Sequence, residues 1–450
     1  MPEFEDTIVA ISTPPGRGGI GIVRLSGPAA RTIAGPILKL RHPLAPAQAR
    51  FAEIIDNTGE TLDEAVATYF EAPHSYTSED IVEIAAHGSP VLLDHLLRQC
   101  LAAGARLAEP GEFTQRAFIS GRLDLTQAEA VHDLIESTTL HQARIAAQQL
   151  GGSVSRQITP IKQQLIALIA ALEAGIDFAE DDIDTLEASG ITAQIQAIQA
   201  PLTALEQTFS YGRIVRDGFT LAIVGRPNVG KSSLFNRLVQ QDRAIVTATP
   251  GTTRDLVTER VSLEGVPVEL IDTAGLRESL DEAESLGIAK SREAMAEADV
   301  VLLILDATEP LHKEDEATIA TLAGRTFLIV INKNDLAHAA LPGPRAFAAL
   351  QTSALTGAGV HELRRAILSL LTIQPLGAET ALLTNLRQQQ AVSAALSALI
   401  QAQQAVIGTI PHEMILLDLY EALHALDALT GATTSDDILD LIFSKFCIGK

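Results

Sequence analysis

The segment Gly225–Ser232 (Gly-Arg-Pro-Asn-Val-Gly-Lys-Ser) has the residue types and the spacing of a loop that binds phosphate groups. The apolar run Phe219–Val224 before it predicts a buried strand, and Ser233–Leu238 after it predicts a helix. Backbone N–H groups in such a loop and at the helix N-terminus favour an anion. We expect Lys231 to reach the β- and γ-phosphates of a nucleotide and Ser232 to bind Mg²⁺. A glycine turn that opens an ordinary helix is the alternative, and the complete pattern in this context argues against it.

Two acidic or hydroxyl-bearing motifs follow along the chain. Thr252–Asp255 lies after Val246 in a predicted loop, where a switch segment supplies a threonine, here Thr253, to Mg²⁺. The predicted strand Pro267–Ile271 ends in Asp272–Gly275 (Asp-Thr-Ala-Gly). This motif offers a second acidic group and a glycine N–H for the γ-phosphate. Either motif alone also fits an ordinary turn at a strand end.

The base-recognition signal comes from two later segments. The predicted strand Phe327–Ile331 ends in Asn332–Asp335 (Asn-Lys-Asn-Asp). Asp335 can accept the protons on guanine's edge that adenine cannot supply, so we expect GTP rather than ATP, with Ser353–Leu355 supporting the base. Because all five motifs occur in order, the alternative that each is an ordinary turn becomes negligible. The residues expected to bind GTP are Asn228, Val229, Gly230, Lys231, Ser232, Ser233, Thr247, Thr252, Thr253, Asp272, Thr273, Ala274, Gly275, Asn332, Lys333, Asp335, Ser353 and Ala354.

Composition limits the class of protein. The chain has 450 residues, 47% of them hydrophobic, which predicts two to four domains with sizeable cores. Two cysteines cannot form a disulfide framework, the start lacks signal-peptide features, and no apolar run reaches the ~20 residues of a membrane span. We therefore expect a cytoplasmic protein without a membrane partner. The formal net charge of −23 argues against a large nonspecific nucleic-acid surface, so any RNA contact is local or shared with a partner.

The order of patterns predicts a multidomain fold that combines α/β and all-α domains. Short strand patterns dominate residues 1–120, which we expect to form an α+β domain. The glycine-rich Gly16–Gly19 runs between two predicted strands and lacks Lys-Ser, so we expect a β-turn there. Residues 123–149 contain no Gly or Pro and predict one helix that Gly151 and Gly152 stop.

Helical patterns lie on both sides of the phosphate-loop unit. Leu165, Leu168, Ile169 and Leu172 share one helix face, and similar spacing recurs after residue 390. The simplest architecture inserts a P-loop α/β domain into one helical domain. We expect an N-terminal domain at residues 1–120, a first helical segment at 121–215, the inserted nucleotide domain at 216–373 and a second helical segment at 374–450.

With its N-terminal Thr13–Gly19, Pro110–Thr114, Leu123–Ala130, this nucleotide domain and the ending Cys447–Lys450, the whole chain resembles the MnmE (TrmE) family of tRNA-modification GTPases. The resemblance implies a homodimer that works with an FAD-containing partner of the MnmG (GidA) type. Together they would install a carboxymethylaminomethyl or aminomethyl group on the wobble uridine of certain tRNAs. It also implies that residues 1–120 resemble folate-binding domains, dimerise and take a one-carbon tetrahydrofolate.

The resemblance assigns further residues. Arg24, Glu83, Arg122 and Lys450 would line the folate pocket. Position 122 is often lysine in the family, and arginine keeps the charge while changing the hydrogen-bond geometry.

Hydrolysis of GTP requires another group to orient the attacking water, because Leu276 stands where small GTPases commonly place a glutamine for that task. Asn228 offers a side-chain oxygen beside the phosphates. By resemblance, K⁺ would stabilise transition-state charge there, and Glu284 would position the water. Glu284 equally fits a solvated carboxylate on an acidic segment. The expected K⁺ ligands are Asn228, Thr247, Thr249 and Thr252.

Cys447 is a candidate reactive thiol beside the folate pocket. The apolar face of Asp436–Phe443 can dock this tail onto the helical domain. A chance thiol near the chain end is the alternative, and Gly449 and Lys450 do not fit a prenylation signal.

The sequence leaves two other functions open. One is a GTPase switch in ribosome assembly that modifies nothing itself, although such proteins usually carry a basic RNA-binding domain. The other is a stand-alone folate enzyme with a regulatory GTPase.

Overall fold

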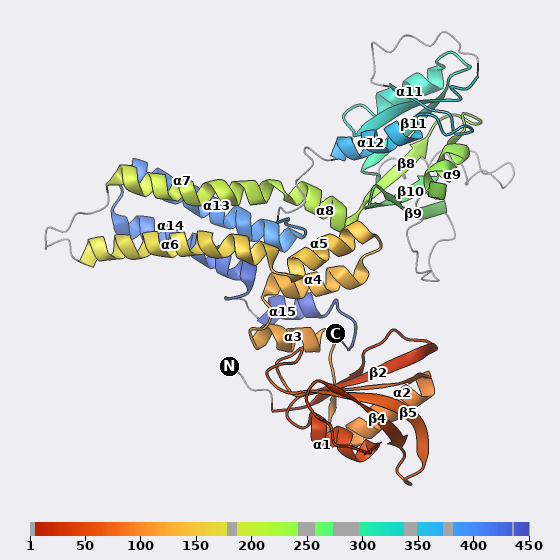
Figure 1. Ribbon diagram of the computed structural model, residues 1–450. Helices are drawn as coiled ribbons and strands as arrows, with labels where there is room; N and C mark the ends of the chain where they lie inside the picture. The colour runs from red at the N-terminus through yellow and green to blue at the C-terminus, as the bar shows by residue number, and fades with distance from the viewer. Residues whose placement is uncertain are drawn as a thin grey trace. The chain divides into compact units, whose positions relative to one another are not determined.

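The computed structural model describes residues 5–177, 187–241, 257–272, 297–336, 349–371, 381–433 and 436–449. Its contacts form two compact units, residues 1–132, 150–183 and 411–450 in the first and residues 133–149 and 184–410 in the second. The elements, many of which are labelled in Figure 1, are β1 (Ile8–Ile11), β2 (Gly18–Ser26), α1 (Ala30–Ala34), the 3-10 helix η1 (Gly35–Ile37), β3 (Leu38–Leu40), β4 (Gln48–Ile55), β5 (Thr61–Phe70), β6 (Ile81–Gly88), α2 (Pro90–Ala102), β7 (Arg106–Leu107), α3 (Glu112–Ile119), α4 (Leu125–Glu136), α5 (Leu140–Leu150), α6 (Ser153–Asp177), α7 (Ala188–Gln207), α8 (Phe209–Asp217), β8 (Phe219–Val224), α9 (Lys231–Gln241), β9 (Val257–Leu263), β10 (Val266–Asp272), β11 (Val300–Asp306), α11 (Lys313–Thr321), β12 (Phe327–Asn332), β13 (Ala349–Gln351), α12 (Val360–Leu371), α13 (Leu386–Ile407), α14 (His412–Thr430) and α15 (Asp436–Phe443).

The first unit contains a seven-stranded sheet in the order β3-β4-β5-β6-β2-β1-β7. Its strand pairs are antiparallel except for β1 with β7. Side chains alternate across the sheet, so Ala65, Ala67 and Tyr69 of β5 are all buried on one face. Leu93 and Leu96 of α2 pack into that same core. This mixed α/β arrangement agrees with the pattern expected for residues 1–120.

The prediction of one helix over residues 123–149 was wrong, because the chain forms α4 and α5 with a break at 137–139. The side-chain oxygen of Gln142 accepts hydrogen bonds from the backbone N–H groups of Thr138 and Thr139, at 2.9 and 3.0 Å. Ser137 donates its hydroxyl to the carbonyl of Leu134. Hydroxyl and amide side chains thus supply local hydrogen bonds that compete with continuous helix, and a search for Gly and Pro alone does not detect them.

Long helices pack in pairs within each unit. In the first unit α6 lies along α14, and in the second α7 lies along α13. The predicted face of α6 is buried, with Leu165 and Leu168 fully enclosed. The apolar spacing after residue 390 falls on α13, where Leu399 is buried whereas Ile400 is 47% exposed. Within the residues that the structure describes, no helix combines the length and apolar character needed to cross a bilayer.

The second unit contains a six-stranded sheet in the order β13-β12-β11-β8-β10-β9. All neighbours run parallel except β9 with β10. Leu221 and Ile223 of β8 face the core that includes α9 and α12, whereas Val224 faces the core beneath α11. Chain order reverses direction across the sheet at β8, and such a switch point is where open parallel sheets bind ligands, at the carboxyl ends of the strands.

The C-terminal segment docks onto the first unit, and this contact explains the Pro110–Thr114 motif. Pro110 forms an isolated antiparallel bridge with Ile448, and the N–H of Gly111 bonds the carbonyl of Cys447 at 3.4 Å. Phe443 of α15 is buried together with Leu125 of α4. The apolar face of α15 therefore holds the tail against the helices around residues 110–131, the docking that the sequence suggested.

Gly111 is a point of close approach in this docking. Its φ is +70°, in the left-handed region, and a Cβ there would lie 2.7 Å from the carbonyl oxygen of Phe443. Gly121 has nearly the same φ, +75°, but a Cβ there meets nothing within 4 Å. The two glycines thus share one backbone constraint and differ in steric room.

We predict that Gly111→Ala loosens the tail and that Gly121→Ala does not. Each change adds left-handed strain of about 1–2 kcal/mol, but only Gly111→Ala forces α15 away, at a further cost of about 1–3 kcal/mol. Hydrogen exchange of residues 436–449 is the measurement, and it should accelerate in Gly111→Ala alone. Equal exchange in the two variants would contradict the assigned close approach.

Candidate functional site

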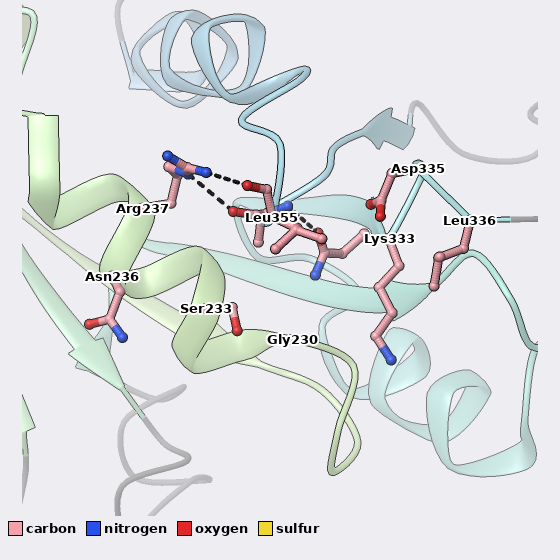
Figure 2. Close-up of a pocket in the computed structure, with 10 residues that line it drawn as sticks. Gly230, Ser233, Asn236, Arg237, Lys333, Asp335, Leu336 and Leu355 are labelled. Atoms are coloured by element: carbon pink, nitrogen blue, oxygen red, sulfur yellow. Dashed lines mark hydrogen bonds between the residues drawn. The ribbon is translucent and has the colours of Figure 1, made fainter.

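A cavity of about 440 Å³ opens at the carboxyl ends of the parallel strands of the second unit. Figure 2 shows α9 on one side of it and the segments that follow β12 and β13 on the other. Its lining residues are Gly230, Ser233, Asn236, Arg237, Asn332, Lys333, Asp335, Leu336, Ala354 and Leu355. The cavity thus joins the start of α9 to the segments predicted to recognise a base.

The phosphate loop leads from β8 into α9, as the sequence predicted. Lys231 is only 8% exposed, and its Nζ donates to the carbonyls of Gly225 and Arg226 at 2.8 and 2.7 Å. Ser232 is exposed in the first turn of α9. Asn228 is exposed at the loop tip with φ +60°. The ammonium group and the helix N-terminus together place positive potential where phosphates are expected.

Asn332 joins three segments of the site. Its side chain is buried, and its Nδ2 donates to the carbonyl of Val229 in the phosphate loop at 3.0 Å. Its Oδ1 accepts from the backbone N–H of Ala354, also at 3.0 Å. Gly230, with φ +97°, permits this approach, because a Cβ at that position would overlap Asn332 Nδ2. The glycine and the amide therefore depend on each other.

Asp335 and Lys333 are each held by a side chain from another segment of the chain. The hydroxyl of Ser353, itself fully buried, donates to a carboxylate oxygen of the exposed Asp335. Lys333 Nζ lies 2.5 Å from Oδ2 of Asp306 at the end of β11. Burial acts to raise the pKa of Asp306, but hydrogen bonds from Lys333 and Thr308 outweigh it and hold that pKa below its usual value. Asp306 is thus an anionic anchor for the lysine.

Arg226, like Lys333, is a cation held by carboxylates, and the sequence patterns did not single it out. Its Nε bonds both carboxylate oxygens of Asp315, at 3.1 and 3.0 Å, and its side chain also pairs with Glu309 at 2.9 Å. Asp315 is 2% exposed. Burial acts to lower the pKa of Arg226, but these carboxylates raise it above its usual value. The only sequence signal was an arginine inside the phosphate loop.

The structure describes a portion of the predicted nucleotide site. It brings residues 228–233 together with residues 332–335 and 353–354 around one cavity. Asp272 ends β10 and pairs in register with Ile223 of β8, so the chain leaves both strands at the same edge. Ser232 and Asp272 carry oxygen atoms of the kind that Mg²⁺ prefers as ligands. The remaining expected residues of this site, Thr247, Thr249, Thr252, Thr253, Thr273, Ala274, Gly275 and Glu284, lie outside the described residues.

A second cluster lies in the first unit and contains three residues of the expected folate pocket. Arg24 and Glu83 are register partners on β2 and β6, and their side chains pair at 2.7 Å. The guanidinium of Arg24 lies over the ring of Tyr76, 5.8 Å from its centroid, and that of Arg122 lies over the same ring at 5.9 Å. Tyr76 therefore brings the two arginines together. The fourth expected residue, Lys450, lies outside the described residues.

Tyr76 and Phe113 were missed by the sequence reasoning. Phe113 is fully buried and lies 5.6 Å beneath the guanidinium of Arg24. The Tyr76 hydroxyl and that of Thr114 share a hydrogen bond of 2.9 Å, and burial raises the pKa of the phenol. In a chain with only 4% aromatic residues, an aromatic residue in the Pro110–Thr114 motif was an available signal.

The two cysteines have opposite surroundings. Cys447 is exposed, and its backbone bonds Gly111, two residues from Phe113 beneath Arg24. Cys100 is fully buried, and burial raises the pKa of its thiol to about 12. A thiol acts as a nucleophile through its thiolate, so only Cys447 has the exposure that chemistry requires.

Comparisons with known proteins identify the family of this chain. A family profile described as the MnmE helical domain matches residues 125–447, and one described as the N-terminus of the GTP-binding protein TrmE matches residues 7–122. The tRNA modification GTPase MnmE of Koribacter versatilis is 58% identical, covering 99% of this chain and 100% of its own. The protein of that name from Aquifex aeolicus is 42% identical, covering 99% and 100%.

A third relative, the tRNA modification GTPase MnmE of Acetivibrio thermocellus, is 39% identical and covers 99% of both chains. These alignments span the N-terminal sheet, the helices and the nucleotide unit. With a profile match over more than half of its length and full-length relatives well above 30% identity, the chain belongs to the MnmE family of tRNA modification GTPases.

Proposed function

We propose that this GTPase reads guanine with Asp335 and binds the phosphates with Gly225–Ser232. The observation that carries this proposal is the single cavity lined both by the start of α9 and by Asp335 and Ala354. The Ser353 hydroxyl orients the Asp335 carboxylate toward the base edge. Lys231, already bonded to loop carbonyls, is positioned to exchange these partners for phosphate oxygens.

The phosphate side would hold two cations. Mg²⁺ would bind Ser232 and Thr253, and would neutralise charge on the phosphate oxygens. K⁺ would bind Asn228, Thr247, Thr249 and Thr252. Because Leu276 cannot orient water, we assign that task to Glu284. Two observations support these assignments: Asn228 is exposed at the loop tip, and Ser232 is exposed at the start of α9.

We further propose that the chain acts on the wobble uridine of certain tRNAs, with an FAD-containing partner of the MnmG type and a one-carbon tetrahydrofolate. The name shared by its full-length relatives supports tRNA modification. The paired Arg24 and Glu83, with Arg122 over Tyr76, support the folate pocket. Guanidinium groups suit the carboxylates of a folate tail, and a carboxylate suits the N–H groups of its pterin.

The proposed organisation is a cytoplasmic homodimer built from three kinds of domain. Residues 1–120 would be a folate-binding-like dimerisation domain, and residues 216–373 would be a G domain inserted between helical segments 121–215 and 374–450. The separate sheets of residues 8–107 and 219–351 support two α/β domains. Docking of residues 447–449 beside Gly111 would bring Cys447 to the folate pocket.

We predict that GTP hydrolysis is faster in K⁺ than in Na⁺ at equal ionic strength, by roughly tenfold or more, the range of a lost transition-state charge partner. Because Asn228 has φ +60°, Asn228→Gly removes its side chain without adding backbone strain. That variant should hydrolyse GTP at one low rate in both salts. A K⁺ effect that survives Asn228→Gly would remove this residue from the cation site.

Base recognition is tested by Asp335→Asn. The amide presents donors where the carboxylate accepted, so GTP should bind more weakly and the xanthosine nucleotide more tightly. Competition between the two nucleotides on the full-length protein measures this exchange. Unchanged GTP affinity would show that Asp335 does not read the base.

Cys447→Ser separates the two activities. If the thiol acts in tRNA modification, the serine variant should keep K⁺-stimulated GTP turnover and lose modification, because a hydroxyl is a far weaker nucleophile at neutral pH. Cys100→Ala is the control, since its buried thiol should not react and modification should persist. Wobble-uridine mass spectrometry and GTP turnover are measured on the same preparation. Normal modification by Cys447→Ser would exclude the thiol.

A further inference from the structure

Arg237 lies on α9, six residues after the phosphate-binding Lys231, yet its side chain turns toward the opposite wall of the cavity. Its Nε donates to the carbonyl of Ala354 at 3.0 Å, and its terminal NH₂ donates to the carbonyl of Leu355. Figure 2 shows both bonds reaching from α9 to the loop after β13. We propose that Arg237 is a positioning residue for guanine recognition.

The loop that Arg237 holds is also closed on itself. Ser353 and Gly357 close it locally, through a backbone bond of 2.8 Å from the N–H of Gly357 to the carbonyl of Ser353. Leu355 is 78% exposed although its side chain is large and apolar. The leucine is therefore not anchored by burial, and the hydrogen bonds from Arg237 supply what packing does not.

Ala354 is fixed from two directions. Its N–H donates to Asn332 and its carbonyl accepts from Arg237. Since both ends of the residue are bonded, the wall of the cavity at Ala354 and Leu355 has a defined position before any nucleotide arrives. Such preorganisation improves affinity because the loop loses no further freedom on binding.

The chemistry of the side chain suits this task. A guanidinium presents N–H groups in a planar fork and can bond two carbonyls on neighbouring residues at once, whereas a lysine ammonium is a single point of charge. Because α9 also begins at the phosphate loop, Arg237 connects the base side of the cavity to the phosphate side through one rigid helix. It acts on binding of the base, and it does not touch the region where the γ-phosphate is expected.

This inference rests on the proposed base-binding role of Asp335 and Ser353–Leu355. The test therefore compares Arg237→Ala and Arg237→Lys with Arg365→Ala, which removes an exposed arginine from α12 outside the cavity. Affinities of the full-length protein for GTP, GDP and the xanthosine triphosphate are measured by fluorescent-nucleotide competition. Steady-state GTP turnover gives kcat and KM.

Arg237→Ala should weaken GTP and GDP equally, by roughly tenfold to a hundredfold, the range for losing charge-assisted hydrogen bonds. KM should rise while kcat at saturating GTP stays unchanged, and Arg237→Lys should restore some of the affinity. Preference for GTP over the xanthosine nucleotide should persist, because Asp335 is intact. Arg365→Ala should behave as the unaltered protein.

Three results would overturn the proposal. They are nucleotide affinity within twofold of the unaltered protein, a loss of kcat that matches the loss of affinity, or an equal loss in Arg365→Ala. A failure of Asp335→Asn to change base preference is a separate result, because it would refute the base assignment. The role of the hydrogen bonds from Arg237 to the loop would then be judged by Arg237→Ala alone.

Discussion

The cavity of the second unit, where we propose that GTP binds, depends on the buried amide of Asn332. One side chain bonds the phosphate loop at Val229 and the base-side loop at Ala354. Because the amide is almost completely buried, an unpaired donor or acceptor there would carry a desolvation penalty of about 1–3 kcal/mol. Both loops are therefore held at the positions that satisfy Asn332, and Gly230 must lack a Cβ for the same reason.

The remaining anchors extend this arrangement outward. Asp306 holds Lys333, Ser353 holds Asp335, and Asp315 holds Arg226. Each pair joins a residue of a predicted nucleotide motif to a residue from a different segment of the chain. The parallel sheet makes this possible, because the carboxyl ends of its strands share one edge. The site is thus a network of mutually supporting loops.

The first unit uses a comparable principle around arginine. Arg116 is 1% exposed and pairs with Asp6, Glu79 and Glu112. Removing one partner from such a buried network leaves a charge uncompensated, which is strongly destabilising. This network fixes α3, and α3 carries Phe113 beneath Arg24 and Thr114 against Tyr76. The positions of Arg24 and Arg122 therefore depend on a network of charged groups elsewhere in the first unit.

Elements with local patterns could be predicted from the order of the amino acids. The phosphate loop between β8 and α9, the strands that end in Asp272 and Asn332, and the helical face of α6 were all predicted, because hydrophobic period and motif spacing are properties of neighbouring residues. The break between α4 and α5 was missed because side-chain hydrogen bonds at Thr138 and Thr139 make it. The folded chain was needed to show which groups meet over long sequence distances: Arg226 with Asp315, Arg237 with Ala354, Tyr76 with Arg24 and Arg122, and Gly111 with Phe443. These contacts depend on strand order and on the docking of the chain's two ends, which no local pattern encodes.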